Sequence, residues 1–172
     1  MGIDIRTLGS RTTGAFNVAR ALNAPGFFIT LAGDSIKGAA AIGLSRTLGV
    51  SELVGMLVLI AVVLGHDFPF QLGFRGGNGL AAAGGALLVY DPSLALALAV
   101  FFCVSLPVLW IGKVLLKAPV RYYTPSKLTV IAAPLMAMAL GREGWLVLGL
   151  GVLVVVILTT IRSNLRNLAR GD

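Results

Sequence analysis

The sequence predicts an all-α fold, namely a polytopic helical membrane protein that forms a single domain over residues 1–172. Of its 172 residues, 57% are hydrophobic and only 12% are charged, whereas a soluble domain is about half apolar and about one quarter charged. The apolar residues also form long runs, which a soluble core of this size has no room to bury. These two observations exclude an ordinary soluble domain, and the low charge excludes a disordered chain.

Six apolar segments, separated by polar loops, are expected to be transmembrane helices. They are Pro25–Leu48, Val50–His66, Gly79–Tyr90, Leu94–Leu116, Leu128–Leu140 and Trp145–Ile161. A straight helix needs about 20 apolar residues to cross the hydrocarbon core. The third and fifth segments are shorter than this, so we expect some of the helices to be short or broken.

The basic residues predict the orientation of these spans. Six crossings place both termini on one side, together with eleven of the 14 Lys and Arg residues. Arg46 and Arg142 lie on the other side, and Lys37 lies within a span. The positive-inside rule therefore places both termini and the loops 66–79 and 113–127 in the cytoplasm.

The first span carries two charges, Asp34 and Lys37, which share one helix face because they are three residues apart. Such charges are costly within a membrane. One interpretation is a structural ion pair, and the other is the wall of a polar cavity in which Lys37 faces an anion. Ala39 and Gly43 follow at helical spacing, which favours close approach of a second helix.

A Gly-rich loop, Gly65–Gly79, precedes the third span. Gly76 and Gly77 allow backbone N–H groups to converge at the start of a helix, and Arg75 and Asn78 supply side-chain donors. This arrangement is typical of an anion cradle, although the loop is not a Walker A sequence. The alternative is a tight re-entrant turn.

The run Gly9–Arg20 is rich in hydroxyl, amide and guanidinium groups, including Ser10, Asn17 and Arg20. We interpret it as a polar loop over a ligand, or as an interfacial segment that meets anionic lipid heads. Ser126 is placed to cap the fifth helix. The basic tail that contains Asn164 is expected to be a solvated, lipid-facing amphipathic stretch.

His66 is the only histidine and Cys103 the only cysteine. His66 is a candidate general base, or a neutral hydrogen-bonding partner beneath the glycine loop. Zinc sites of the usual kinds are excluded, and we expect no metal and no cofactor. The charges follow the membrane and no nucleic-acid-reading element is present, so we expect no nucleic-acid partner.

Together, these loops resemble the acyl-phosphate-dependent glycerol-3-phosphate acyltransferases, the PlsY family of bacterial membrane enzymes. Gly9–Arg20 is similar to the family pattern Gly-Ser-x-Asn-x-Gly-Ala-Thr-Asn-x-x-Arg, and Asp34–Gly38 is a complete Asp-x-x-Lys-Gly. Gly65–Gly79 is similar to Gly-His-x-Phe-Pro-x-Phe-Leu-x-Phe-Lys-Gly-Gly-Lys-Gly. The loop at Arg121 and the tail from Asn164 also look like those of the family.

The resemblance implies transfer of a fatty acyl group from acyl phosphate to glycerol 3-phosphate, giving lysophosphatidic acid and phosphate for phospholipid synthesis. It implies the bacterial inner (plasma) membrane, with acyl phosphate, glycerol 3-phosphate and membrane lipids as partners. We expect phosphate groups to be bound by cations and amides, polar oxygens to be oriented by hydroxyls and amides, and His66 to act as a base or a loop brace. The expected substrate-binding residues are Ser10, Asn17, Arg20, Asp34, Lys37, Arg75, Gly76, Gly77, Asn78, Ser126 and Asn164.

The sequence departs from the family pattern at several positions. Thr12 stands in place of Asn, Phe16 in place of Thr, Arg75 and Asn78 in place of Lys, and Ile161 in place of a tail histidine. The family usually has seven helices, the additional one preceding the first motif. We therefore expect either a start codon placed too late or a trimmed variant.

Two alternative functions follow from these departures and from the broken spans. One is a catalytically impaired relative that binds an anionic lipid or a phosphorylated metabolite. The other is a small organic-anion transporter, because broken helices and a charge pair at mid-membrane are typical of such proteins.

Overall fold

The described part of the chain is entirely helical and contains no strand, which confirms the all-α prediction. The computed structural model describes residues 4–115 and 124–170, and for residues 113, 124 and 162–170 it describes the backbone alone. The elements are η1 (Ile5–Thr7), α1 (Ala15–Thr47), α2 (Glu52–Asp67), η2 (Phe70–Leu72), α3 (Leu80–Tyr90), α4 (Pro92–Leu115), α5 (Thr124–Ala139) and α6 (Gly144–Arg170).

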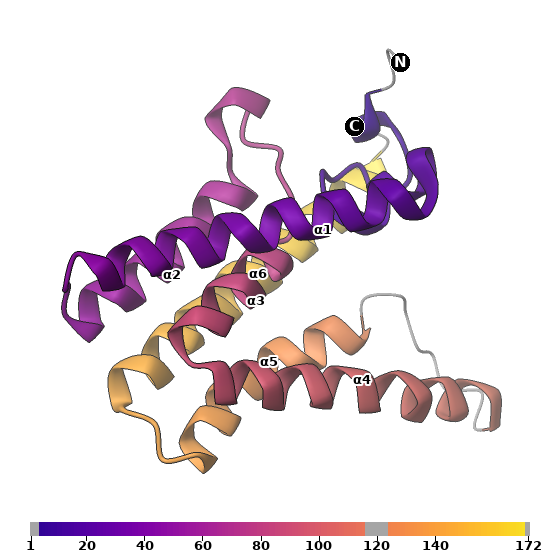
Figure 1. The fold of residues 1–172 in the computed structure, drawn as a ribbon. Helices are drawn as coiled ribbons and strands as arrows, with labels where there is room; N and C mark the ends of the chain where they lie inside the picture. Colours follow the sequence, from indigo (N-terminus) through magenta and orange to yellow (C-terminus); the bar gives the residue numbers. More distant parts are fainter. Residues whose placement is uncertain (1–3, 116–123, 171–172) are drawn as a thin grey trace.

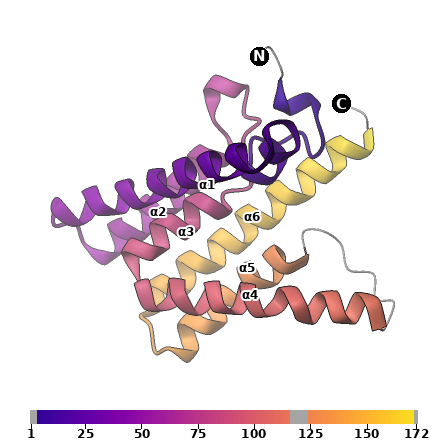
Figure 2. The same ribbon diagram turned by 45° about the vertical axis from the view of Figure 1, so that its right-hand side comes forward.

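The helices form one bundle in which α1 packs most extensively on α3 (Figure 1). Helix α5 contacts both α4 and α6. The N-terminal segment and the last turns of α6 lie at the same end of this bundle in both views (Figure 2). Both ends of the chain lie on the same side of a membrane when the number of passes is even. The arrangement therefore agrees with the six passes expected from the sequence.

Four helical segments of the described chain are long and apolar enough to cross a membrane: Ala15–Thr47, Glu52–Leu72, Pro92–Gly112 and Gly144–Ile161. The apolar helices α3 and α5 are shorter, with 11 and 16 residues. At a rise of about 1.5 Å per residue, α3 is about 17 Å long, whereas the hydrocarbon core is about 30 Å thick. The prediction of short helices among the spans is confirmed.

The N-terminal boundary of α1 differs from the sequence prediction. The helix begins at Ala15 rather than Pro25, so the expected polar loop over Gly9–Arg20 is wrong from Ala15 onward. The helix is interrupted at Asn23, which has φ 57° and ψ −156°. Asn adopts a positive φ more often than most other residues do, and Pro25 has no N–H to continue the helical hydrogen bonds across this point.

At this interruption the segment 15–22 folds back on the rest of α1. Phe16 and Phe27 are eleven residues apart, a separation that spans about 16 Å along a straight helix, yet their ring centroids lie 4.9 Å apart. A Cβ placed on Gly26 would lie 3.1 Å from Val18 Cγ1, which shows the same close return.

The helices α1 and α3 meet at glycines. A Cβ on Gly38 would collide with the carbonyl oxygen of Ala82, and one on Gly85 would collide with that of Ser35. Gly43, where the sequence suggested close approach, faces open space. The close contact is therefore made one turn nearer the middle of α1, on the face that carries Gly38.

The last two helices also differ from the predicted boundaries. Ser126 lies inside α5, whose first described residue is Thr124, so it is not the cap expected from the sequence. Pro125 fits the first turn of a helix, where its missing N–H has no intrahelical partner to lose, and the helix therefore begins before Ser126. The backbone of the basic tail continues α6 to Arg170.

Candidate active site

The polar loop that precedes α1 is held in place by one amide side chain. Asn17 is 1% exposed, and its Oδ1 accepts a hydrogen bond from Ser10 N at 2.9 Å. Its Nδ2 donates to the carbonyl oxygens of Ile5 and Thr12, both at 2.8 Å. These hydrogen bonds bring the chain on both sides of Ser10 onto the first turn of α1.

The hydroxyls of Ser10 and Thr12 face each other across this loop, with their oxygen atoms 3.1 Å apart. Both residues are buried. Thr13 N donates to the carbonyl oxygen of Gly76 at 3.3 Å, which joins this loop to the Gly-rich loop. Two segments that are far apart in the sequence thus form one polar wall.

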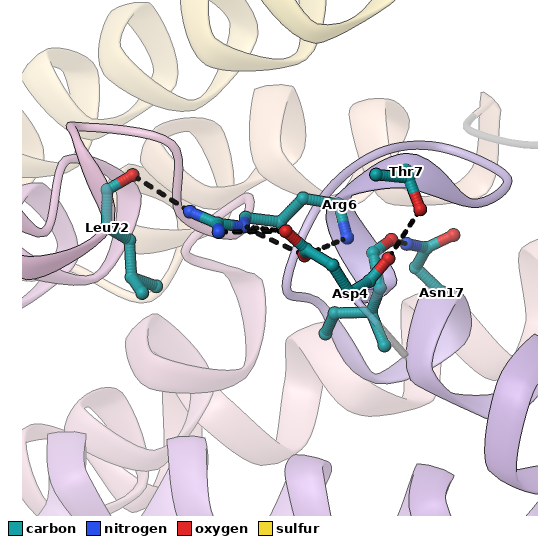
Figure 3. A network of polar contacts seen from close by, with 6 residues as sticks. Asp4, Arg6, Thr7, Asn17 and Leu72 are labelled. Carbon is teal, nitrogen blue, oxygen red and sulfur yellow. Dashed lines mark hydrogen bonds and ion pairs between the residues drawn. The ribbon is translucent and has the colours of Figure 1, made fainter. Parts of the chain in front are cut away.

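An exposed brace lies beside this wall (Figure 3). The guanidinium of Arg6 binds the Asp4 carboxylate, with Nη2 2.9 Å from Oδ2, and its Nη1 donates to the carbonyl oxygen of Leu72 at 3.4 Å. The hydrogen bonds and charge of Arg6 lower the pKa of Asp4. The brace connects the N-terminal segment to the loop around η2.

Inside the bundle, Asp34 on α1 contacts two cationic or basic groups. Its Oδ1 lies 3.4 Å from Lys37 Nζ and 3.4 Å from Nδ1 of His66 on α2. The side chains of Asp34 and His66 are largely buried, whereas that of Lys37 is 57% exposed. A carboxylate at Nδ1 favours the imidazole form that carries a proton there, so Asp34 orients the His66 ring.

The Gly-rich loop packs directly on this histidine. Gly77 N donates to the His66 carbonyl oxygen at 3.3 Å, and Gly76 N donates to the Asp67 carbonyl oxygen at 3.1 Å. A Cβ on Gly77 would collide with His66 Nε2. Gly79 is the N-cap of α3 and has φ 67°, a conformation that glycine adopts without strain.

Asp67 is a buried acid that sequence reasoning did not single out. It is 2% exposed, and neither carboxylate oxygen has a hydrogen-bond partner among the described residues. The nearby Thr160 hydroxyl donates its proton to the Val156 carbonyl oxygen at 3.0 Å. A Cβ on Gly79 would lie 2.9 Å from Asp67 Oδ1, so this acid lies behind the Gly-rich loop.

These elements enclose a cavity of about 390 Å³, which we call the polar cavity. It combines hydroxyl, amide, carboxylate and imidazole groups from four parts of the chain. Its polar lining consists of Ser10, Thr12, Asn17, Asp34, His66, Asn78 and Ser126. Five of the predicted substrate-binding residues and the candidate base are thereby brought together.

A second cavity of about 540 Å³, which we call the apolar cavity, adjoins the first. Residues of all six α-helices line it, and aliphatic side chains dominate its wall. The two cavities share seven lining residues: Phe16, Phe27, Leu31, Leu80, Ala81, Phe102 and Ser126. Together they offer a polar compartment that leads into a hydrophobic one.

The remaining predicted site residues do not line the polar cavity. Gly76 and Gly77 lie buried behind it, and Arg20 packs against Gly9. Lys37 and Arg75 are exposed. Arg20, Lys37 and Arg75, the three predicted phosphate-binding cations, therefore do not line the polar cavity. Among the described lining residues there is no Lys or Arg, and Asp34 contributes a carboxylate.

Two other predictions lie outside the described residues. The backbone of Asn164 belongs to α6, but its side chain is not among the described parts of the structure. The loop at Arg121 lies wholly outside the described residues. Sequence reasoning, in turn, did not identify Thr12, Phe27 and Phe102 as residues that line the polar cavity. Thr12 lies within the first motif, whereas the two phenylalanines lie in apolar runs that carry no signal of a cavity.

Comparison with known proteins agrees with this architecture. Residues 1–171 match the family model described as glycerol-3-phosphate acyltransferase. The chain belongs to this family. A glycerol-3-phosphate acyltransferase 1 from Desulfitobacterium hafniense is 41% identical over 166 residues, which are 96% of this chain and 77% of that protein. A glycerol-3-phosphate acyltransferase from Thermus thermophilus is 37% identical over 172 residues, which are 99% of this chain and 80% of that protein.

Solved structures in the family have the same fold. One is the crystal structure of PlsY, an integral membrane glycerol 3-phosphate acyltransferase, in its glycerol 3-phosphate form. It is similar to this chain with a TM-score of 0.80 at 30% identity, covering 99% of this chain and 80% of that one. The lysophosphatidic acid form gives a TM-score of 0.75 at 29% identity, covering 95% and 79%. The resemblance seen in the sequence motifs is confirmed, and the chain is an integral membrane protein of a bacterial family.

Proposed function

We propose that the protein transfers a fatty acyl group from acyl phosphate to glycerol 3-phosphate and releases lysophosphatidic acid and inorganic phosphate. The observation that carries this proposal is the junction of the polar cavity with the apolar cavity, because both reactants have a phosphate end and one also has a long hydrocarbon chain. The membership in the acyltransferase family supports the same reaction.

The polar cavity supplies the groups for the phosphorylated ends. Ser10, Thr12, Asn78 and Ser126 offer hydroxyls and an amide for the oxygens of glycerol 3-phosphate. Arg20, Lys37 and Arg75 are proposed to contribute positive charge from outside the lining, and Asn164 to contribute from α6. The amide of Asn17 is already used by Ser10, Ile5 and Thr12, so its proposed role is to position the loop.

The reaction needs alignment more than activation, because acyl phosphate already has a good leaving group. The oxygen of one glycerol 3-phosphate hydroxyl attacks the acyl carbon, the ester C–O bond forms, and the bond between the acyl carbon and the phosphate oxygen breaks. The hydroxyl proton ends on the released phosphate or passes through a base. Holding the two reactants together supplies much of such a rate increase, and dipoles at the site stabilise the developing charge.

Asp34 and the Gly-rich loop support a positioning role for His66. Asp34 lies at Nδ1, and Gly77 packs against Nε2. We propose that the imidazole braces the loop that begins α3, with general-base action as the second possibility. A brace would hold Asn78 at the polar cavity, whereas a base would have to reach the attacking hydroxyl.

The bacterial inner membrane is the proposed location, with both termini and the site on the cytoplasmic side. The excess of Lys and Arg on the side of the termini supports this orientation.

The test uses the purified full chain in lipid nanodiscs with acyl phosphate and radiolabelled glycerol 3-phosphate. Labelled lysophosphatidic acid is the expected result. Saturable binding of glycerol 3-phosphate without product would instead support a catalytically impaired relative. In vesicles, accumulation of unmodified label inside would support an organic-anion transporter.

A matched pair of variants ties this activity to the polar cavity. Thr12→Val removes a hydroxyl that lines the cavity, whereas Thr47→Val removes one at the exposed end of α1. We expect Thr12→Val to raise KM for glycerol 3-phosphate severalfold and Thr47→Val to leave it unchanged. Equal behaviour of the two variants would argue against this cavity as the acceptor site.

A further inference from the structure

Phe16 and Phe27 stand where the polar cavity meets the apolar cavity. Both residues line both cavities. Their ring centroids are 4.9 Å apart with an interplanar angle of 57°. This is a tilted aromatic contact within the range of favourable ring pairs.

The fold-back of α1 creates this pair. Without the break at Asn23, Phe16 would lie about three turns away from Phe27 along the same helix. With it, the first helical segment returns and places the Phe16 ring on Phe27. Phe27 in turn makes an edge contact with Phe28, with ring centroids 5.3 Å apart and an interplanar angle of 84°.

The position of the pair matters because the two cavities differ in what they hold. The polar cavity has hydroxyl, amide and carboxylate groups that bind water, whereas aliphatic side chains dominate the wall of the apolar cavity. Aromatic rings offer water no comparable hydrogen bonds. A ring pair at the junction therefore places apolar surface between the polar side chains of one cavity and the aliphatic wall of the other.

This separation bears on the chemistry of an acyl phosphate. Water can attack the same acyl carbon as glycerol 3-phosphate does. The bond between that carbon and the phosphate oxygen then breaks, giving a free fatty acid and inorganic phosphate, with protons shared between the two products. Excluding water from the reacting centre prevents this side reaction.

We propose that Phe16, packed against Phe27, is a water seal at the junction of the two cavities. The seal holds the acyl carbon at the boundary and directs it toward glycerol 3-phosphate instead of water. The inference rests on the proposed acyl transfer, and it assigns a role in the specificity for the acceptor to a residue that departs from the family pattern, which has Thr at this position.

The experiment measures how the acyl group is divided between two acceptors. Protein in nanodiscs receives acyl phosphate labelled in its chain together with glycerol 3-phosphate, and free fatty acid and lysophosphatidic acid are quantified. Phe16→Ala and Phe16→Thr open the junction, and Phe16→Leu keeps an apolar side chain of intermediate size. Phe28→Ala is the control, because Phe28 touches Phe27 but is not part of the lining of either cavity.

We expect Phe16→Ala and Phe16→Thr to raise the ratio of fatty acid to lysophosphatidic acid severalfold. Phe16→Leu should lie between these variants and the unmodified protein, and Phe28→Ala should match the unmodified protein. An unchanged ratio in Phe16→Ala, or an equal rise in Phe28→Ala, would overturn the seal.

A second measurement does not require turnover, so it separates the seal from the proposed function. A dansyl-labelled fatty acid is bound to each protein, and its emission reports the polarity around the bound probe. We expect red-shifted emission in Phe16→Ala and in Phe27→Leu, but not in Phe28→Ala. Emission that is identical in all of them would overturn the seal, whereas absence of lysophosphatidic acid from the unmodified protein would count against the acyl transfer alone.

Discussion

Asp34 on α1 and His66 on α2 meet inside the bundle, where Asp34 Oδ1 lies 3.4 Å from His66 Nδ1. The two residues belong to different sequence motifs, and their contact joins the charge pair of the first span to the Gly-rich loop. We therefore expect the orientation of the His66 ring, and through it the position of Gly77, to depend on this carboxylate.

The contact predicts the effect of Asp34→Asn. The substitution keeps the shape of the side chain but removes the charge that orients His66, so the loop that carries Asn78 loses its alignment. We expect kcat/KM to fall by up to about 100-fold, as misplacement of reacting groups does. Steady-state kinetics measure this, with Glu143→Gln as a control on an exposed turn. A loss that is equal in the two variants would contradict the prediction.

Gly77→Ala should displace the His66 ring from its Nε2 side, opposite the Nδ1 that Asp34 contacts. Its Cβ would collide with His66 Nε2, so either the ring or the loop must move. We expect a fall in kcat of about tenfold or more in a protein that still folds, as judged by its thermal unfolding. The matched control is Gly43→Ala, whose Cβ meets nothing within 4 Å. Normal activity in Gly77→Ala would show that the contact has no role.

Gly85→Ala tests the packing of α1 on α3. The added methyl would collide with the Ser35 carbonyl oxygen, whereas Gly84→Ala, one residue earlier, would meet open space. Overpacking of this kind typically costs about 1–3 kcal/mol. Unfolding in detergent should therefore show a lower melting temperature for Gly85→Ala than for Gly84→Ala. The reverse order would mean that the helices are not in contact at this point.

An ion pair joins the α3–α4 turn to the α5–α6 turn, at the end of the bundle opposite the termini. Arg142 Nε lies 2.8 Å from Asp91 Oδ2. Burial alone would raise the pKa of Asp91, but hydrogen bonds from Ser93 and Leu94 and the charge of Arg142 lower it below its usual value. A carboxyl with a lowered pKa in the folded protein contributes stability above its unfolded pKa of about 3.9, and this stability is lost as the pH falls through the folded pKa.

Thermal unfolding measured between neutral and strongly acidic pH checks this sign. The unmodified protein should lose more stability on acidification than Asp91→Asn, which has no carboxyl to protonate, and the two curves should converge at the lowest pH. Parallel curves over the whole range would show that the ion pair contributes nothing to folding.

The sequence predicted the helices well because long apolar runs and Gly-rich turns mark them directly. The resemblance of the motifs to the acyltransferase family also implied that Ser10, Asp34, His66 and Asn78 belong to one site. It did not predict the start of α1, since the polar residues of Gly9–Arg20 read as a loop. Only the structure shows that Asn17 is buried and that both its Oδ1 and its Nδ2 form hydrogen bonds.

The aromatic junction was beyond sequence reasoning for a different reason. Phe16 was visible as a departure from the family pattern, whereas Phe27 is one of four phenylalanines in apolar runs. Their contact depends on a backbone reversal at Asn23, and a single residue with positive φ leaves no periodic signal. The exposure of Arg75 is likewise a property of the folded loop rather than of the Gly-Gly motif that follows it.

The central claim is that the phosphate end and the hydrocarbon chain of one reactant occupy two adjoining cavities. A structure of the full chain with lysophosphatidic acid bound tests this most directly. The account predicts the phosphate beside Ser10, Thr12 and Asn78, the chain among α3, α4 and α6, and the ester between them at Phe16 and Phe27. A headgroup bound away from these polar-cavity residues, or a chain lying on the outer surface of the bundle, would contradict it.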